Sequence, residues 1–123
     1  MISLRMLLVE QDKAFTGTAV AGSPFVTVTG NHRVYLGQAV RGTPLYTVVG
    51  NKLFKGMSTA GFPLATLVGD LMYKGTQVSG TPLARLKGTM SYKGIAGSGF
   101  PIVTVPSRNV ATLFAATYHA LLG

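Results

Sequence analysis

Apolar residues occur in this chain as short runs that are separated by glycines. The run "PLYTVV" at 44–49 is followed by a Gly and then by "KLFK" at 52–55, and the same order recurs along the sequence. Runs of this length, rich in β-branched residues and bounded by Gly, are typical of strands and too short for helices. Small and polar residues flanked by Gly separate one pair of runs from the next. Each unit is therefore predicted to be strand, turn, strand and loop.

The pattern is a tandem repeat. The first unit is 20 residues long and the next three are 19, since the units begin at Gly17, Gly37, Gly56, Gly75 and Gly94. Every unit has Gly at its sixth position and Pro at its eighth. An aromatic residue closes four units: Tyr35, Phe54, Tyr73 and Tyr92. A fixed period of this size indicates a repeat architecture, in which units that cannot bury their apolar faces alone pack on one another.

Two columns of the repeat have predicted roles at the turns and strand starts. The glycine that follows the first strand is expected to adopt a positive φ, which is costly for residues that carry a Cβ. A Pro opens the first strand, where its missing N–H is tolerated. The residues in these two columns include Gly50, Gly69, Gly88, Pro44, Pro63 and Pro82.

Both predicted strands carry apolar residues on both faces, which bears on how the units assemble. A monomeric β-solenoid has one interior and would stack Lys55, Lys74 and Lys93 as a ladder of like charges about 4.8 Å apart. In an intertwined homotrimer the neighbouring chains cover the second face and the strand edges. We therefore predict an all-β protein of tandem β-repeats, about 19 residues long, assembled as an intertwined homotrimer with a short C-terminal α-helix.

The ends differ from the array. The chain divides into an N-terminal arm (1–16), a five-unit repeat array (17–107) and a C-terminal helical segment (108–123). Apolar residues of the arm alternate with polar ones, which is the pattern of a strand that adds to another sheet. These apolar residues are Ile2, Leu4, Met6 and Leu8.

The C-terminal segment has a helical period. Apolar residues share one face at i, i+3 and i+4 spacing, namely Val110, Leu113, Phe114, Tyr118 and Leu121. Ser107 and Asn109 are both candidate N-caps. Because a helix of this length is marginal alone, we expect three copies to bundle or each copy to dock on a host particle. Both ends are thus candidate docking segments, and deleting either should leave the array folded.

Composition narrows the class of partner. The 123 residues are enough for a single domain, with 47% hydrophobic and 11% charged residues. Eleven Lys and Arg against three Asp and Glu give a net charge of +8, which favours nucleic acid, an acidic protein surface or anionic lipid. The absence of Cys excludes disulfides and thiolate metal sites. The apolar C-terminal stretch is shorter than the roughly 20 residues that span a bilayer, so no membrane partner is expected.

No group of residues indicates catalysis. The carboxylates Glu10, Asp12 and Asp70 form no acid–base pair, and His32 and His119 lie far apart without further ligands near them in the sequence. We expect no catalytic residues, no metal site, no cofactor and no enzymatic activity.

Lys55, Lys74 and Lys93 are candidate contacts to an anion because they recur in one column. The aromatics beside them could stack on the bases of a nucleic acid. Recurrence at one position of successive units is, however, more typical of core residues, and the lysines would then keep an apolar fibre soluble. A third interpretation is docking on an acidic protein lattice. Nucleic acid is therefore an alternative partner rather than the favoured one.

The run "PLATLVGDLMYKG", followed by "GTPLARLKG", resembles the triple β-spiral repeat of adenovirus-type fibre shafts and of some bacteriophage spikes. That repeat has a Pro-Leu strand, a turn marked by Gly and a second hydrophobic strand. The resemblance covers residues 17–107, although the present unit is several residues longer, and the extra length falls in the Gly-flanked loop.

The resemblance implies a structural component of a viral particle, most closely of a tailed phage, assembled in the host cytoplasm. Such a protein would be a trimeric fibre, spike or capsid decoration protein that docks on a capsid or tail protein. Two other functions stay open: a basic β-repeat protein that binds nucleic acid, and a monomeric β-solenoid adhesin.

Overall fold

A computed structural model describes residues 11–18, 22–29, 32–38, 42–95, 97, 99–107 and 109–122. The predicted docking residues Ile2, Leu4, Met6 and Leu8 lie outside the described residues. Within the described residues the chain is mostly β, with one short C-terminal helix. The elements are β1 (Gln11–Thr16), β2 (Val26–Thr29), β3 (Arg33–Leu36), β4 (Tyr46–Val49), β5 (Lys52–Lys55), β6 (Ala65–Val68), β7 (Leu71–Lys74), β8 (Ala84–Lys87), β9 (Met90–Lys93), β10 (Val103–Thr104) and α2 (Val110–Leu122).

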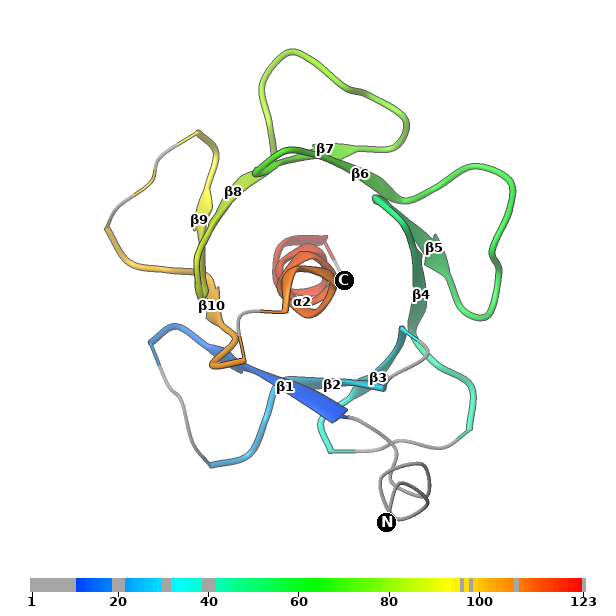
Figure 1. Cartoon of the computed structure of the whole chain (residues 1–123), viewed down its shortest axis with the longest axis vertical. Coiled ribbons are helices and arrows are strands. Elements are labelled where there is room, and N and C mark those ends of the chain that lie inside the picture. Colours follow the sequence, from blue (N-terminus) through cyan, green and yellow to red (C-terminus); the bar gives the residue numbers. More distant parts are fainter. Residues whose placement is uncertain are drawn as a thin grey trace, which may run out of the picture.

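The ten strands form one closed antiparallel barrel (Figure 1). Strands that are neighbours in sequence are neighbours in the sheet, and the ring is completed by pairing β1 with β10. In that pair Phe15 lies opposite Thr104, as Phe54 lies opposite Thr47 within the β4–β5 hairpin. The barrel therefore consists of five equivalent hairpins, of which the fifth is made from the first and the last strand.

The hairpin turns explain both the turn glycines and the one irregular spacing. Gly50, Gly69 and Gly88 have φ of 60°, 63° and 64°, which confirms the positive φ predicted for them. Each is the first residue of a two-residue turn, the position where type II′ turns need glycine. The first hairpin has one residue more between its strands, and there His32 takes a φ of 65°. This extra turn residue makes the first unit 20 residues long.

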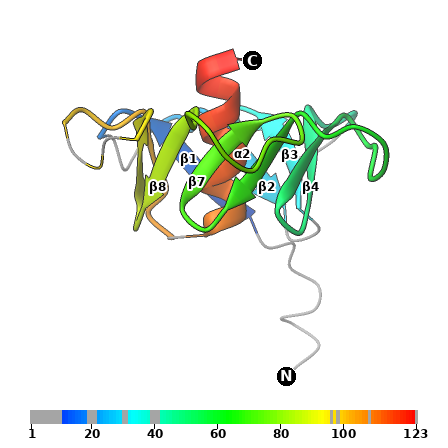
Figure 2. The same cartoon turned by 90° about the horizontal axis from the view of Figure 1, so that it is seen from above.

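The inner face of the barrel packs around α2. The helix runs along the barrel axis and emerges at the end from which the long loops spread (Figures 1 and 2). Leu113 and Phe114 are fully buried in the same cluster as inward residues of the strands, among them Val34 and Leu53. The helix fills the space that a ring of this many strands encloses.

Polar contacts hold α2 at its start and in its middle. Asn109 is the N-cap, since its Oδ1 accepts a hydrogen bond of 3.1 Å from the backbone N–H of Thr112. Within the barrel the Thr117 hydroxyl bonds to the Leu113 carbonyl oxygen and lies 2.7 Å from Ser91 Oγ in a hydroxyl–hydroxyl hydrogen bond. Ser91 stands where other units have Val34, Leu53 and Met72.

The outer face of the barrel is buried in the layer next to the long loops and exposed nearer the hairpin turns, where Val49 and Val68 lie. The aromatic column lies on this face, and Tyr35, Phe54 and Tyr73 are buried there, on the side of the sheet from which the long loops project (Figure 1). A threonine opposite each of these aromatics donates a hydrogen bond to the carbonyl oxygen of the glycine that begins a loop. The pairs are Thr27 with Gly37 (2.6 Å), Thr47 with Gly56 (2.7 Å), Thr66 with Gly75 (2.7 Å) and, across the closure, Thr104 with Gly17 (2.6 Å).

The coarse prediction of β-repeats followed by a short helix is confirmed. The triple β-spiral is not what this chain shows, because each described strand pairs with strands of its own chain. An intertwined homotrimer is expected from the sequence because the second apolar face and the strand edges need partner chains. Here α2 covers the inner face, the outer face is buried in the layer next to the loops, and closure pairs part of the edges.

Two boundaries of the prediction also need correction. Gln11–Thr16 was assigned to the arm but forms β1 of the barrel. The first strand of each unit begins two residues after its proline, so Pro44, Pro63 and Pro82 are buried residues of the loop ends rather than strand residues.

Candidate docking surfaces

The described residues contain no group of three His, Cys, Asp or Glu side chains that could hold a metal ion. His119 lies where α2 emerges from the barrel, and its Nδ1 is 2.8 Å from the Tyr46 hydroxyl. Its ring also lies 5.3 Å from that of Phe25, between centroids. Burial lowers the pKa of His119 and raises the pKa of Tyr46, so both are held neutral near pH 7. Their arrangement is that of packing residues.

Lys55, Lys74 and Lys93 all lie at the loop end of the barrel and are exposed. They stand opposite Tyr46, Ala65 and Ala84, which face inward, so the lysines lie on the inward side of the rim. One strand separates each from the next, which places them about 10 Å apart, where salt screens their repulsion. They lie at the same end of the barrel as the carbonyl end of α2 (Figure 2), whose partial negative charge favours cations.

Three of the four aromatics of the repeat are not available for stacking, and the fourth, Tyr92, is half-buried. Tyr35, Phe54 and Tyr73 are buried beneath the loops. A nucleic acid could thus meet the lysines but not the faces of these rings. The interpretation of the aromatics as core residues is the one that agrees with their burial.

The helical docking residues are satisfied within the chain. Leu113, Phe114 and Tyr118 are buried inside the barrel, and Leu121 packs against the same core. The prediction that this face needs something to pack on holds, but its partner is the chain's own sheet. Of the five predicted residues Val110 alone is exposed, at the start of the helix.

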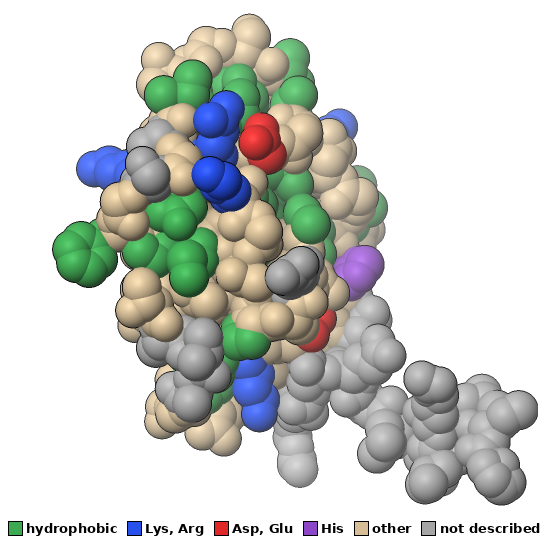
Figure 3. Space-filling model, turned by 60° about the vertical axis from the view of Figure 1, so that its left-hand side comes forward, with side chains coloured by type: hydrophobic (Ala, Val, Ile, Leu, Met, Phe, Trp, Pro, Cys, Tyr) green, Lys and Arg blue, Asp and Glu red, His purple; other side chains and the backbone are tan. Residues whose placement is uncertain are grey.

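Exposed apolar side chains gather instead on the long loops. Phe62 is 92% exposed and Phe100 is 94% exposed, and both occupy the residue before the buried proline of their units. Met57, Val78 and Ile95 are further exposed apolar residues of the same loops. Figure 3 shows hydrophobic side chains exposed beside basic ones on one face of the molecule. Large apolar side chains are candidate contacts for other molecules where they form an exposed patch with their neighbours.

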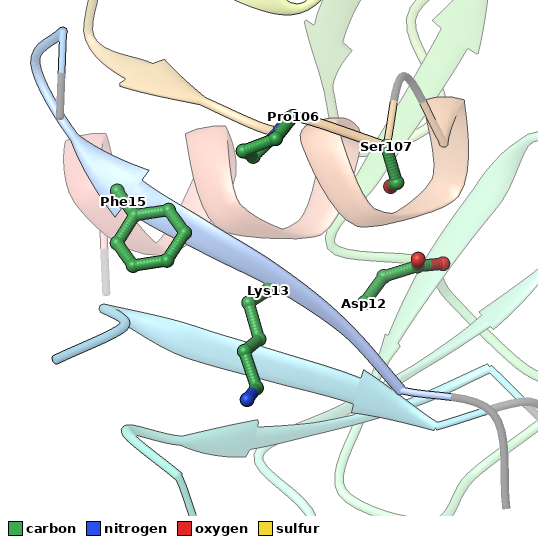
Figure 4. A pocket seen from close by; sticks show the side chains of 5 residues that line it. All are labelled: Asp12, Lys13, Phe15, Pro106 and Ser107. Carbon is green, nitrogen blue, oxygen red and sulfur yellow. The ribbon is translucent and has the colours of Figure 1, made fainter. Parts of the chain in front are cut away.

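A second feature lies at the closure of the barrel. Beside β1, a hollow of about 280 Å³ is lined by Asp12, Lys13, Phe15, Pro106 and Ser107. In Figure 4 Lys13 and Phe15 extend from one side of β1, while Asp12 extends on the side of Ser107. The hollow occupies the place where the other four hairpins have their tight turns.

Sequence reasoning missed both features. The closure of the barrel by β1 could have been found from the sequence, because "DKAFTG" at 12–17 repeats the second-strand pattern of "NKLFKG" at 51–56. That match identifies residues 12–16 as the missing strand of a fifth hairpin. The exposure of Phe62 and Phe100 had no such signal, since a Phe beside a Pro-Leu run reads equally well as a core residue.

No family model matches this chain, and neither a curated protein nor a solved structure matches it. Among the described residues, the 13-residue α2 is too short to cross a bilayer, and no helix there could span one.

Proposed function

We propose that this protein is a non-enzymatic structural component of a viral particle, of the capsid decoration type, that docks on another virion protein through its long loops. The observation that carries docking is the near-complete exposure of Phe62 and Phe100 on the long loops of a barrel whose inner face is filled by α2. The virion as its location rests on the resemblance of the repeats to those of viral fibre shafts.

The closed barrel favours decoration over a fibre shaft. Strands of four residues span about 13 Å, so one chain is a short ring rather than a long rod. Adding units cannot lengthen it, because the described edge strands pair with each other. A trimer remains part of the proposal, formed by contacts between closed barrels in place of interwoven shafts.

The basic surface supports an acidic partner. The described cations are Lys13, Arg33, Lys52, Lys55, Lys74, Arg85, Lys87 and Lys93, against Asp12 and Asp70. This charge would steer the barrel towards an acidic protein lattice and raise its association rate. The same charge supports the alternative of nucleic-acid binding, which the burial of the aromatics disfavours.

The test is incorporation into particles of a double variant, Phe62→Ser with Phe100→Ser. If the loops dock, incorporation should fall by more than tenfold, since each anchor of this kind carries about 2 kcal/mol. The melting temperature should hardly change, because neither side chain is buried. The matched control is Thr43→Ser with Thr81→Ser, which alters exposed residues in the same column and should incorporate normally.

Normal incorporation of the double Phe variant would remove the loops as the docking site. Absence of the wild-type chain from purified particles would overturn the virion proposal. The nucleic-acid alternative predicts tight binding with steep salt dependence, lost when Lys55, Lys74 and Lys93 are all changed to Gln.

A further inference from the structure

Within the part of the chain that the structure describes, the edge of β1 that faces β10 is paired along only part of its length. Its register with β2 runs from Gln11 to Ala14, whereas its register with β10 contains only Phe15 and Thr16. In the β4–β5 hairpin the corresponding pairing continues for two more residues, to Val49 opposite Lys52. The segment 11–14 of β1 therefore has a described partner strand on one side only.

The backbone of Lys13 points towards the unpaired side. The Ala14 carbonyl accepts a hydrogen bond from Phe25 N–H, so Ala14 faces β2, while Gly17 N–H donates to the Ile102 carbonyl and so faces the β10 side. Backbone groups alternate along a strand, which aims those of Lys13 at the β10 side. The residue that would pair with it is Pro106, which has no N–H to donate.

The hollow beside this edge has room for an added strand. Its walls are the outward side chains of Lys13 and Phe15, the inward side chain of Asp12, and the turn at Pro106 and Ser107 (Figure 4). An unpaired strand edge next to such a space is a template for another extended segment.

The chain itself carries a segment of the right kind. Residues 2–6 alternate apolar and polar side chains, Leu7 and Leu8 are both apolar, and two further residues lead into β1. Seven extended residues span about 23 Å, enough to reach a neighbouring molecule. Folding back onto its own β1 would need a tight turn at Val9 and Glu10. Neither residue suits the positive φ that such turns require.

Charge also matches the arm to the edge. Asp12 is paired with Val28, a core residue, so it lies on the inward face, while Lys13 lies on the outward face. In any register that puts the arm's apolar residues beside Phe15 on the outward face, Arg5 lies on the inward face with Asp12, because cross-strand neighbours share a face. Arg5 is the arm's cation and Asp12 is the anion of this edge.

We propose that residues 2–8 of one copy of this chain add as a strand to the free edge of β1 in a second copy, next to the hollow at Pro106. Each chain has one arm and one acceptor edge, so the contact is head-to-tail and closes into a ring when the rotation per step allows it. This inference does not rest on the proposed function, since it concerns association of the chain with itself.

The experiment uses charge reversal in the full chain, with Arg5→Asp and Asp12→Arg made singly. Each variant alone should associate at least about tenfold more weakly than wild type, because like charges then face each other. A mixture of the two single variants should recover association, since each arm then meets an edge of opposite charge. Sedimentation gives the mass in each case, from 12.9 kDa for one chain upwards.

A second measurement keeps the proposal testable if Asp12→Arg fails to fold. Exchange of the Lys13 amide hydrogen should be slow in the full chain and fast after deletion of residues 2–8, while the Ala14 amide, which faces β2, is unchanged. Recovery only when both changes are in one chain would mean that each arm binds its own edge. That result would overturn the proposal that arms pass from one copy to another. Fast exchange of the Lys13 amide hydrogen in the full chain would overturn it as well. So would association that is equally strong in the wild type and in both single variants.

Discussion

Single residues of this fold are constrained by backbone geometry more than by contacts. A Cβ placed on Gly69 would have no atom within 4 Å, yet the residue has a φ of 63°. The first position of a type II′ turn needs this conformation. Any cost of substitution there comes from the backbone alone.

We expect Gly69→Val to destabilise the protein by about 1–3 kcal/mol, the cost of holding a side-chain-bearing residue in that region. Met57→Ser is the control, because Met57 is 55% exposed on a loop and should leave stability unchanged. Thermal unfolding followed by circular dichroism measures both. Equal melting temperatures for the two variants would contradict this account of the turn.

Arg85 is the one departure from the threonines that anchor the loops. It occupies the position of Thr47 and Thr66, so the loop that begins at Gly94 lacks the corresponding hydrogen bond. Its contact with Asp70 is a half-exposed ion pair of 3.5 Å, of a kind that contributes little. The atom in that contact is the buried Nε, for which the ion pair does not amount to a hydrogen bond.

Replacing Arg85 with Thr should therefore stabilise the protein, by about 0.5–1.5 kcal/mol, through a new bond to the Gly94 carbonyl. Arg85→Val is the matched variant, with a similar shape and no hydroxyl. If the two variants unfold at the same denaturant concentration, the threonine hydrogen bond is not what anchors these loops.

At the scale of elements, His119 is one of the residues that join α2 to the sheet, through its contacts with Tyr46 and Phe25. Burial lowers the pKa of its imidazole from the usual 6.5, so the unfolded chain binds the proton more tightly than the folded one. The stability that the neutral ring contributes is present above about pH 6.5 and is lost as the pH falls below it.

We therefore expect the wild type to lose more stability between pH 7.5 and pH 5.5 than His119→Gln does. Gln can still bond to the Tyr46 hydroxyl but does not titrate, and His32 is present in both proteins. The measurement is the denaturant midpoint of each protein at the two pH values. An equal loss in both would show that His119 does not couple α2 to pH.

The elements themselves could be predicted from the sequence, but their partners could not. The second strands at 52–55, 71–74 and 90–93 and the helix from Val110 follow from local pattern, because period and turn residues are local properties. What covers a face is not local. The apolar face of α2 reads alike whether it docks on a partner or fills a barrel, and the exposed Phe100 is indistinguishable by type from the buried Phe114.

At the scale of the whole molecule, the packed core depends on α2, which fills the barrel. With α2 removed, inward residues such as Leu53 and Met72 would line an open ring instead of a packed core. Deleting residues 108–123 should therefore abolish cooperative unfolding, contrary to the expectation that the array folds without them.

This deletion is checked by the loss of a sharp thermal transition and by binding of a dye that detects exposed apolar surface. Val110→Ser is the control, because it changes an exposed residue of the same helix and should unfold like the wild type. A deletion variant that melts cooperatively would show that the barrel folds without α2.

The closure of the ring by its first and last strands also sets an order of events during synthesis. Phe15 is made early, but it must wait for Thr104, and the residues that fill the interior follow later still. Until then, the finished hairpins form a sheet with an uncovered apolar side, a state prone to aggregation. A chain that ends anywhere before Val110 should thus be an aggregation-prone fragment rather than a smaller folded barrel. Chaperones and proteases would have to remove it.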